Sequence, residues 1–124
     1  MIKPFKVLVV EDEVLTAKSM KLDIEDLGVK VLGPVAKGEN SVDIALKENP
    51  DLILMDIRLS GSMNGVEAAQ QILLKKKIPI VFMTGFALKD IKDQAQKLNP
   101  IDYLEKPVDI NRIKQIIEAL KTNL

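Results

Sequence analysis

The chain has 124 residues, a length that suits one core, and we expect one domain over residues 1–124. It has no cysteine and no histidine, which excludes disulfides, thiol nucleophiles, thiolate or imidazole metal ligands and histidine acid–base chemistry. The formal net charge is zero, and no apolar stretch is long enough for a signal peptide or a membrane span. We therefore expect a cytoplasmic protein that contacts neither nucleic acid directly nor a membrane.

The first 50 residues predict two strands that alternate with two helices, over residues 7–10, 14–27, 29–36 and 38–49. The first strand is apolar throughout, and the helix after it repeats apolar residues at helical spacing until Gly28 supplies a stop. Gly33 and Pro34 interrupt the second strand, which suits the edge of a sheet. The second helix ends before Pro50.

The central stretch runs from Leu52 to Asp56 and consists of four apolar residues followed by a carboxylate. A continuous apolar run between turn-forming residues is typical of a strand buried on both faces of a parallel sheet. Ligands of open parallel sheets bind at the carboxyl ends of the strands, so Asp56 is a candidate site residue. The alternative is that Asp56 simply begins a turn.

The rest of the chain continues the pattern with a helix over about 66–76, a strand over 80–83, a helix over 88–98, a strand over 102–104 and a helix over 109–122. Strand and helix alternate five times, which predicts an α/β protein with one parallel sheet and helices on both faces. We expect a flavodoxin-like doubly wound sheet of five strands in the order 2-1-3-4-5. Its switch point lies between the first and third strands, which end near Asp12 and Asp56.

Polar residues follow or end each of the central strands, and they are Glu11, Asp12, Asp56, Thr84 and Lys106. Two unit charges about 4 Å apart repel by roughly 4 kcal/mol at an effective dielectric near 20, so converging carboxylates need raised pKa values or a cation. Mg²⁺ supplies such a charge, because it prefers carboxylate, water and phosphate oxygens as ligands. The strand ends therefore predict a magnesium site, with a lysine and a hydroxyl beside it.

A metal, a lysine and a hydroxyl around one carboxylate suit phosphoryl transfer, because the phosphoryl oxygens need neutralising in the transition state. The chain has no histidine or cysteine, so Asp56 is the candidate nucleophile, and carboxylates do form aspartyl phosphates. Lys106 and Thr84 would hold the product together with the metal.

In these residues the chain resembles the receiver (REC) domains of two-component response regulators, over nearly its whole length. The motifs that carry the resemblance are Glu11-Asp12, Met55-Asp56, Asn64-Gly65, Thr84-Gly85, Tyr103 and Lys106-Pro107. The resemblance implies that Asp56 accepts a phosphoryl group from a histidine kinase or a histidine phosphotransfer protein. It also implies that the chain is not an enzyme beyond self-phosphorylation and self-dephosphorylation, and that the peptide bond between Lys106 and Pro107 is cis.

The resemblance also implies roles for single residues. The ligands of Mg²⁺, or of Mn²⁺ in its place, would be Glu11, Asp12, Asp56 and the backbone carbonyl of Arg58. Thr84 and Tyr103 would form a switch pair that responds to phosphorylation. The fourth helix, the fifth strand and the fifth helix would form the face that exchanges downstream protein partners, with a phosphorylation-dependent dimer as a further expectation.

Three features depart from the usual pattern of these domains. The acidic pair is Glu-Asp where Asp-Asp is commoner, and Ser60 stands where the family usually has proline. The loop after Asp56 is also one residue longer before Gly65. Arg58 and Phe86 each lie two residues beyond a site residue, at positions that flank the path of attacking water in this family. We expect both side chains to slow self-dephosphorylation.

Simpler alternatives stand beside these assignments. Glu11 would favour a helix N-terminus in any case, while Thr84, Tyr103 and Lys106 would suit an ordinary strand or strand exit. For the chain as a whole we expect a stand-alone regulator without a DNA-binding output. The alternatives are a receiver excised from a longer regulator or hybrid kinase, an inert receiver-like module and a haloacid-dehalogenase-like phosphatase. Such a phosphatase needs a second aspartate two residues after its nucleophile, where this chain has Arg58.

Overall fold

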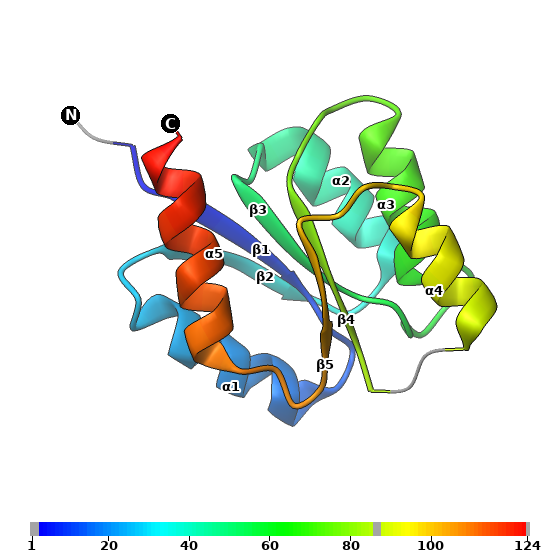
Figure 1. The fold of residues 1–124 in the computed structure, drawn as a ribbon, viewed down its shortest axis with the longest axis horizontal. Coiled ribbons are helices and arrows are strands. Elements are labelled where there is room, and N and C mark those ends of the chain that lie inside the picture. The colour runs from blue at the N-terminus through cyan, green and yellow to red at the C-terminus, as the bar shows by residue number, and fades with distance from the viewer. Residues whose placement is uncertain (1–2, 86–87, 124) are drawn as a thin grey trace.

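The computed structural model describes residues 3–85 and 88–123, in which five strands alternate with five helices (Figure 1). The strands are β1 (Lys6–Val10), β2 (Lys30–Val35), β3 (Leu52–Asp56), β4 (Ile80–Thr84) and β5 (Asp102–Glu105). The helices are α1 (Val14–Glu25), α2 (Gly38–Glu48), α3 (Gly65–Leu73), α4 (Lys89–Gln96) and α5 (Ile110–Thr122). The predicted order and type of the elements are confirmed, and their ends differ by at most a few residues.

The strands form one parallel sheet in the order β2-β1-β3-β4-β5, which confirms the predicted flavodoxin-like topology. Val10 pairs with Met55 across β1 and β3, and Thr84 pairs with Glu105 across β4 and β5. All five strands therefore end at the same edge of the sheet, and the residues that follow them emerge there together.

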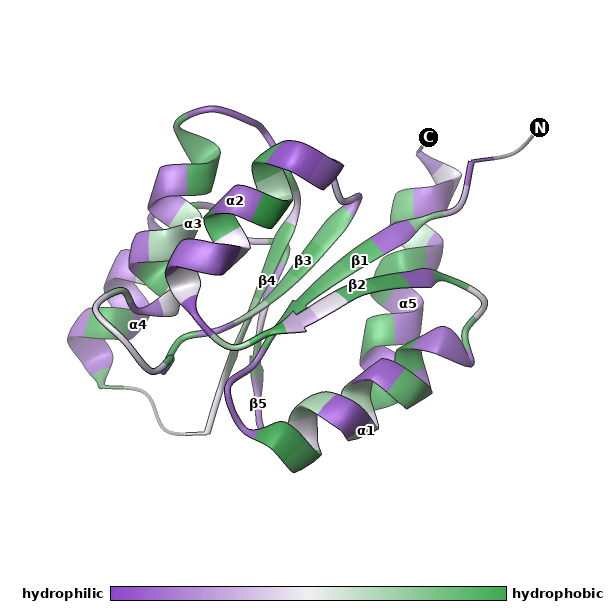
Figure 2. Cartoon of the chain, turned by 180° about the vertical axis from the view of Figure 1, so that it is seen from behind, coloured by the Kyte–Doolittle hydropathy of each residue, from purple (hydrophilic) through white to green (hydrophobic). Residues whose placement is uncertain are grey.

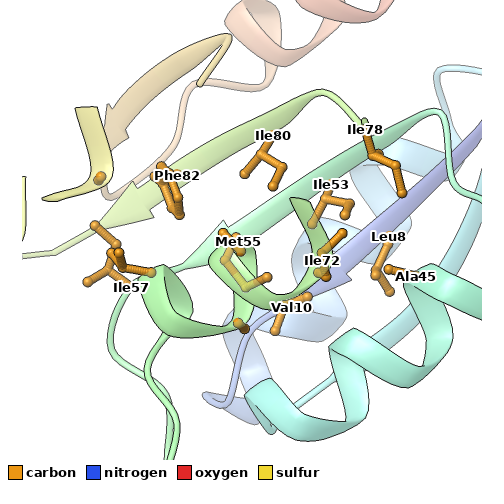
Figure 3. Close-up of a cluster of buried hydrophobic side chains, with 14 of the residues drawn as sticks. Leu8, Val10, Ala45, Ile53, Met55, Ile57, Ile72, Ile78, Ile80 and Phe82 are labelled. Atoms are coloured by element: carbon orange, nitrogen blue, oxygen red, sulfur yellow. The ribbon is translucent and has the colours of Figure 1, made fainter. Parts of the chain in front are cut away.

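Two layers of helices cover the sheet. Helices α1 and α5 lie on one face and α2, α3 and α4 on the other (Figure 1). Alternate residues of one strand serve the two faces: Ile53 and Met55 of β3 pack under α2 and α3, while Leu52 and Leu54 pack under α1 and α5. Figure 3 shows the first of these cores, and Figure 2 shows the apolar colouring of the central strands. Every residue of β3 is buried, as its apolar run predicts.

The helix faces differ in detail from the predicted stripes. Val14, the first residue of α1, fits the apolar spacing of the first helix but is 65 % exposed. In the last helix Ile116 is buried together with Ile113 and Ile117, although it directly precedes Ile117 and so widens the inner face beyond one helical stripe. Helical spacing thus predicts which face of a helix packs against the sheet. It does not predict how many residues of that face become buried.

Two lysines complete the carboxyl end of α2. Lys76, three residues beyond the end of α3, donates to the Leu46 carbonyl oxygen at 2.6 Å and to the Asn49 side chain. Lys6 donates from β1 to the Glu48 carbonyl oxygen. The last carbonyls of a helix have no partners within the helix, and cations are favoured there. These contacts connect the end of α2 to β1 and to the segment that follows α3.

None of the helices in the described chain combines the length and the apolar character that crossing a bilayer requires.

Candidate functional site

Three carboxylates meet at the carboxyl edge of the sheet. Glu11 and Asp12 follow β1, and Asp56 is the last residue of the neighbouring strand β3. Each offers an oxygen atom, and these atoms lie within 4.8 Å of one another. Glu11 and Asp56 are 2 % and 3 % exposed, while Asp12 is half-buried. The structure therefore brings together the three acidic residues that the sequence pattern predicts.

Lys106 reaches the same point from the end of β5. Its Nζ lies 2.5 Å from Glu11 Oε1 and 2.6 Å from Asp56 Oδ2. Its backbone N–H donates to the Thr84 carbonyl oxygen at 2.8 Å, which anchors the segment after β5 to the end of β4. The peptide bond between Lys106 and Pro107 is cis, as the resemblance implies, and that between Gly33 and Pro34 is cis as well. One ammonium faces three carboxylates, so two negative charges are left over when all three are ionised.

The close packing of these charges changes their proton affinities. Burial raises the pKa of Glu11, the hydrogen bond shared with Asp56 raises it further, and Lys106 partly opposes the rise. Burial lowers the pKa of Lys106, but its bonds to Asp56 and Glu11 outweigh burial, and the net shift is upward. Lys106 is therefore positively charged at neutral pH, and the cluster favours either a proton on Glu11 or an added cation.

This shift in Glu11 predicts a pH dependence of stability. The folded state holds the Glu11 proton to higher pH than the unfolded state does, because the pKa of Glu11 in the unfolded state is near 4.5. The contribution of Glu11 to the free energy of unfolding therefore falls as the pH rises from about 4.5 through the raised pKa. Urea unfolding with EDTA at a series of pH values, comparing the parent protein with Glu11→Gln, measures this. As the pH rises, the free energy of unfolding of Glu11→Gln should increase relative to that of the parent protein. A difference that does not change with pH would contradict the prediction.

Backbone N–H groups orient each carboxylate. Glu13 N donates to Glu11 Oε2, Arg58 N donates to Asp56 Oδ1, and Ser60 N donates to Asp12 Oδ2, each at 3.1 Å. The Arg58 peptide therefore lies beside the candidate nucleophile, while the Arg58 side chain is exposed. That the Arg58 carbonyl binds metal stays a prediction, and Phe86 lies outside the described residues.

Gly65 begins α3 at a very close approach to β3. A Cβ at this position would lie 2.0 Å from the Asp56 carbonyl oxygen, a distance that no side chain tolerates. The Gly65 N–H donates to the Ile57 carbonyl oxygen at 2.8 Å. Asn64 caps the helix, because its side chain accepts from Glu67 N while the Glu67 side chain accepts from Asn64 N. The Asn64-Gly65 motif thus sets the backbone behind Asp56, a role that the sequence pattern alone did not reveal.

Thr84 and Tyr103 lie together on the neighbouring strands β4 and β5. Thr84 is buried at the end of β4, and Tyr103 pairs with Phe82 two residues before it. The Tyr103 hydroxyl oxygen is buried. Burial raises the pKa of Tyr103, and an interaction with the Thr84 side chain partly opposes the rise. Lys92 of α4 lies over the Tyr103 ring, with its Nζ 5.5 Å from the ring centroid. Nothing in the sequence pattern points to this contact.

The donor set fits a hard divalent cation. All three acidic side chains offer oxygen, and Mg²⁺ and Mn²⁺ favour carboxylate and water ligands over nitrogen or sulfur. An added divalent charge would also balance the two negative charges that Lys106 leaves. The residues present therefore suit Mg²⁺ on grounds of both ligand chemistry and charge.

Comparison with known proteins identifies relatives of the chain. The family described as response regulator receiver domain matches residues 7–118. The transcriptional regulatory protein PdtaR of Mycobacterium tuberculosis is 31 % identical over 115 residues, which cover 93 % of this chain and 56 % of PdtaR. The chain therefore spans about half the length of this curated relative.

Solved structures show the same fold. The signal receiver domain of a modulated diguanylate cyclase from Desulfovibrio desulfuricans is 36 % identical, with a TM-score of 0.87 and coverage of 93 % of this chain and 91 % of that one. The receiver domain of the sensor histidine kinase PA1611 from Pseudomonas aeruginosa is 27 % identical, with a TM-score of 0.84 and coverage of 95 % and 98 %. That second structure contains a magnesium ion coordinated in its active site cleft.

Proposed function

Because the chain belongs to the response regulator receiver domains, we propose that it is a phosphorelay switch in which Asp56 accepts a phosphoryl group. The donor is a histidine kinase or a histidine phosphotransfer protein, and the reaction depends on Mg²⁺. The observation that supports this most directly is the convergence of three carboxylates and Lys106 around Asp56, whose side chain is otherwise buried. Three carboxylates beside one ammonium leave an excess of negative charge, which a bound cation would offset.

Each residue of the site has a separate role in the phosphoryl transfer. An oxygen of Asp56 forms a bond to phosphorus while the phosphorus–nitrogen bond of the donor breaks, and the leaving imidazole keeps the electron pair and takes a proton. Lys106, 2.6 Å from Asp56, neutralises one phosphoryl oxygen, and the Thr84 hydroxyl binds another. Glu11, Asp12, Asp56 and the Arg58 carbonyl would hold Mg²⁺, which spreads the negative charge that develops on the phosphoryl oxygens.

A hollow beside the site is where we place the phosphodonor. It has a volume of about 600 Å³, lies between α1 and the segment after β5, and includes Lys106 in its wall. Leu15 at its rim is 79 % exposed, and Pro107 and Val108 add apolar surface. A histidine-bearing helix that docks here would bring its side chain to the edge of the sheet where Asp56 lies.

Thr84 and Tyr103 couple the site to the face formed by α4, β5 and α5. When Thr84 turns toward the phosphoryl group, the space beside Tyr103 changes, and the face formed by α4, β5 and α5 exchanges partners or dimerises. The buried hydroxyl of Tyr103 and its contact with Thr84 support this coupling. Arg58 at the mouth of the site, and Phe86 by the resemblance alone, slow the attack of water on the product.

Incubation with acetyl phosphate and MgCl₂, followed by intact mass measurement and peptide mapping, tests the proposal. We expect one phosphoryl group on Asp56 in the parent protein and in Asp43→Asn, whose exposed carboxylate lies on α2, and none in Asp56→Asn or with EDTA. Steady release of phosphate without a stable adduct would indicate a phosphatase, and no adduct would contradict the proposal. Tyr103 is the only tyrosine and the chain has no tryptophan, so tyrosine fluorescence follows the switch in the same samples.

A further inference from the structure

The loop between β3 and α3 contacts the acidic cluster at Asp12. Its Ser60 N–H donates a hydrogen bond of 3.1 Å to Asp12 Oδ2. The other two carboxylates take their backbone donors from residues only two positions away in the chain, whereas Ser60 and Asp12 are 48 positions apart. Asp12 is thus oriented by tertiary structure rather than by its own turn.

The loop is fixed on its outer side by the start of α2. Ser60 forms an isolated parallel bridge with Lys37, the residue that precedes α2. Gly38 packs so closely that a Cβ there would lie 3.0 Å from the Met63 carbonyl oxygen. The bridge to Lys37 and the close packing of Gly38 against Met63 therefore place the Ser60 peptide against the start of α2, and its N–H points at Asp12.

Asp12 is the member of the cluster that most needs such support. Glu11 and Asp56 are buried and bonded to Lys106, whereas Asp12 is half-buried and Lys106 contacts only the other two. A half-buried side chain with rotational freedom loses entropy when it binds a metal. Hydrogen bonds to ligating carboxylates reduce that loss, and removing such partners typically weakens metal binding about 10- to 100-fold.

We propose that the Ser60 backbone N–H is a positioning group for Asp12 and thereby raises the affinity of the acidic cluster for Mg²⁺. The proposal rests on the proposed function only in taking Asp12 as a metal ligand. The side chain of Ser60 is not required, because the donor is the peptide N–H. A proline at position 60 would have no N–H to donate, and the bond to Asp12 would be lost.

Two substitutions at one position separate the N–H from the side chain. Ser60→Pro removes the donor, whereas Ser60→Ala removes only the hydroxyl and serves as the matched control. Isothermal titration with MgCl₂, without any phosphodonor, should give a Kd at least about tenfold higher for Ser60→Pro than for Ser60→Ala, which should match the parent protein. Equal affinities in the two variants would overturn the inference.

A second measurement on the parent backbone keeps the test decisive if Ser60→Pro does not fold. The Ser60 amide should exchange slowly with deuterium in the metal-free protein, and Asp12→Ala should speed its exchange while leaving the Arg58 amide unchanged. A Ser60 amide that is indifferent to Asp12→Ala would overturn the inference. If the parent protein fails to bind Mg²⁺ or to form the Asp56 adduct, the proposed function fails. If it does both while the two Ser60 variants agree, only the role of Ser60 fails.

Discussion

Replacing Lys106 with methionine is expected to lower the free energy of unfolding of the metal-free protein by about 3 kcal/mol at neutral pH. The Lys106 ammonium lies within 2.6 Å of oxygens of both Glu11 and Asp56, and its side chain is 23 % exposed. Without it, two buried carboxylates face each other with no cation. Removing one partner of a buried ion pair typically costs about 3 to 5 kcal/mol of stability. We expect the lower value here, because water reaches part of the Lys106 side chain.

Urea unfolding with EDTA at pH 7 measures this loss. Lys18→Met, at an exposed lysine of α1, is the control and should change stability by less than about 0.5 kcal/mol. Adding MgCl₂ should restore part of the stability of Lys106→Met, because the metal supplies the missing charge. The loss should also shrink at pH 4.5, because burial raises the pKa of Glu11 above that pH and favours its neutral form. A loss that is the same at both pH values would show that Lys106 acts through packing rather than charge.

Gly65→Ala is expected to destabilise the fold by about 3 kcal/mol, the upper end of the usual cost of overpacking. The added Cβ would lie 2.0 Å from the Asp56 carbonyl oxygen and 2.9 Å from the Ile57 Cα, and both are backbone atoms that cannot rotate away. The start of α3 must therefore move off the end of β3. This movement would break the hydrogen bond from Gly65 N to the Ile57 carbonyl and displace the peptide that carries Asp56.

Gly85→Ala provides a control at the same edge of the sheet. A Cβ on Gly85 meets no atom of the described residues within 4 Å, so we expect a change of less than about 0.5 kcal/mol. Thermal unfolding of both variants, together with Mg²⁺ titration, separates damage to the fold from damage to the site. Equal melting temperatures for the two variants would contradict the close approach seen at Gly65.

The sequence predicted the sheet well because its strands have an unambiguous pattern. The run from Leu52 to Met55 is apolar at every position, and such a run between turns is typical of a strand buried on both faces. Parallel strands end at a common edge, so the polar residues that follow them were predicted to meet. The structure does bring together the four charged residues Glu11, Asp12, Asp56 and Lys106. Their convergence could be predicted from the strand ends alone, without knowing the paths of the loops.

What the sequence could not predict depends on the paths of loops and on packing between elements. The bond from Ser60 to Asp12 requires the loop to turn back across the site, and no spacing rule encodes that turn. The contact of Lys92 with the Tyr103 ring depends on the position of α4 over β5. The helix predicted to extend to about residue 76 ends at Leu73, and Lys76 in the turn that follows contacts the end of α2.

The position of Lys106 in the chain has a consequence for how the protein is made. Lys106 follows the last strand and is 50 residues from Asp56, the carboxylate it neutralises. During synthesis β1 and β3 emerge from the ribosome well before β5, so their acidic residues precede the only ammonium that contacts Glu11 and Asp56 among the described residues. Until residue 106 is made, Glu11 and Asp56 therefore lack the ammonium that contacts them in the folded protein. Docking of β5 beside β4 brings Lys106 to the two carboxylates, so completion of the sheet and neutralisation of its acidic edge coincide.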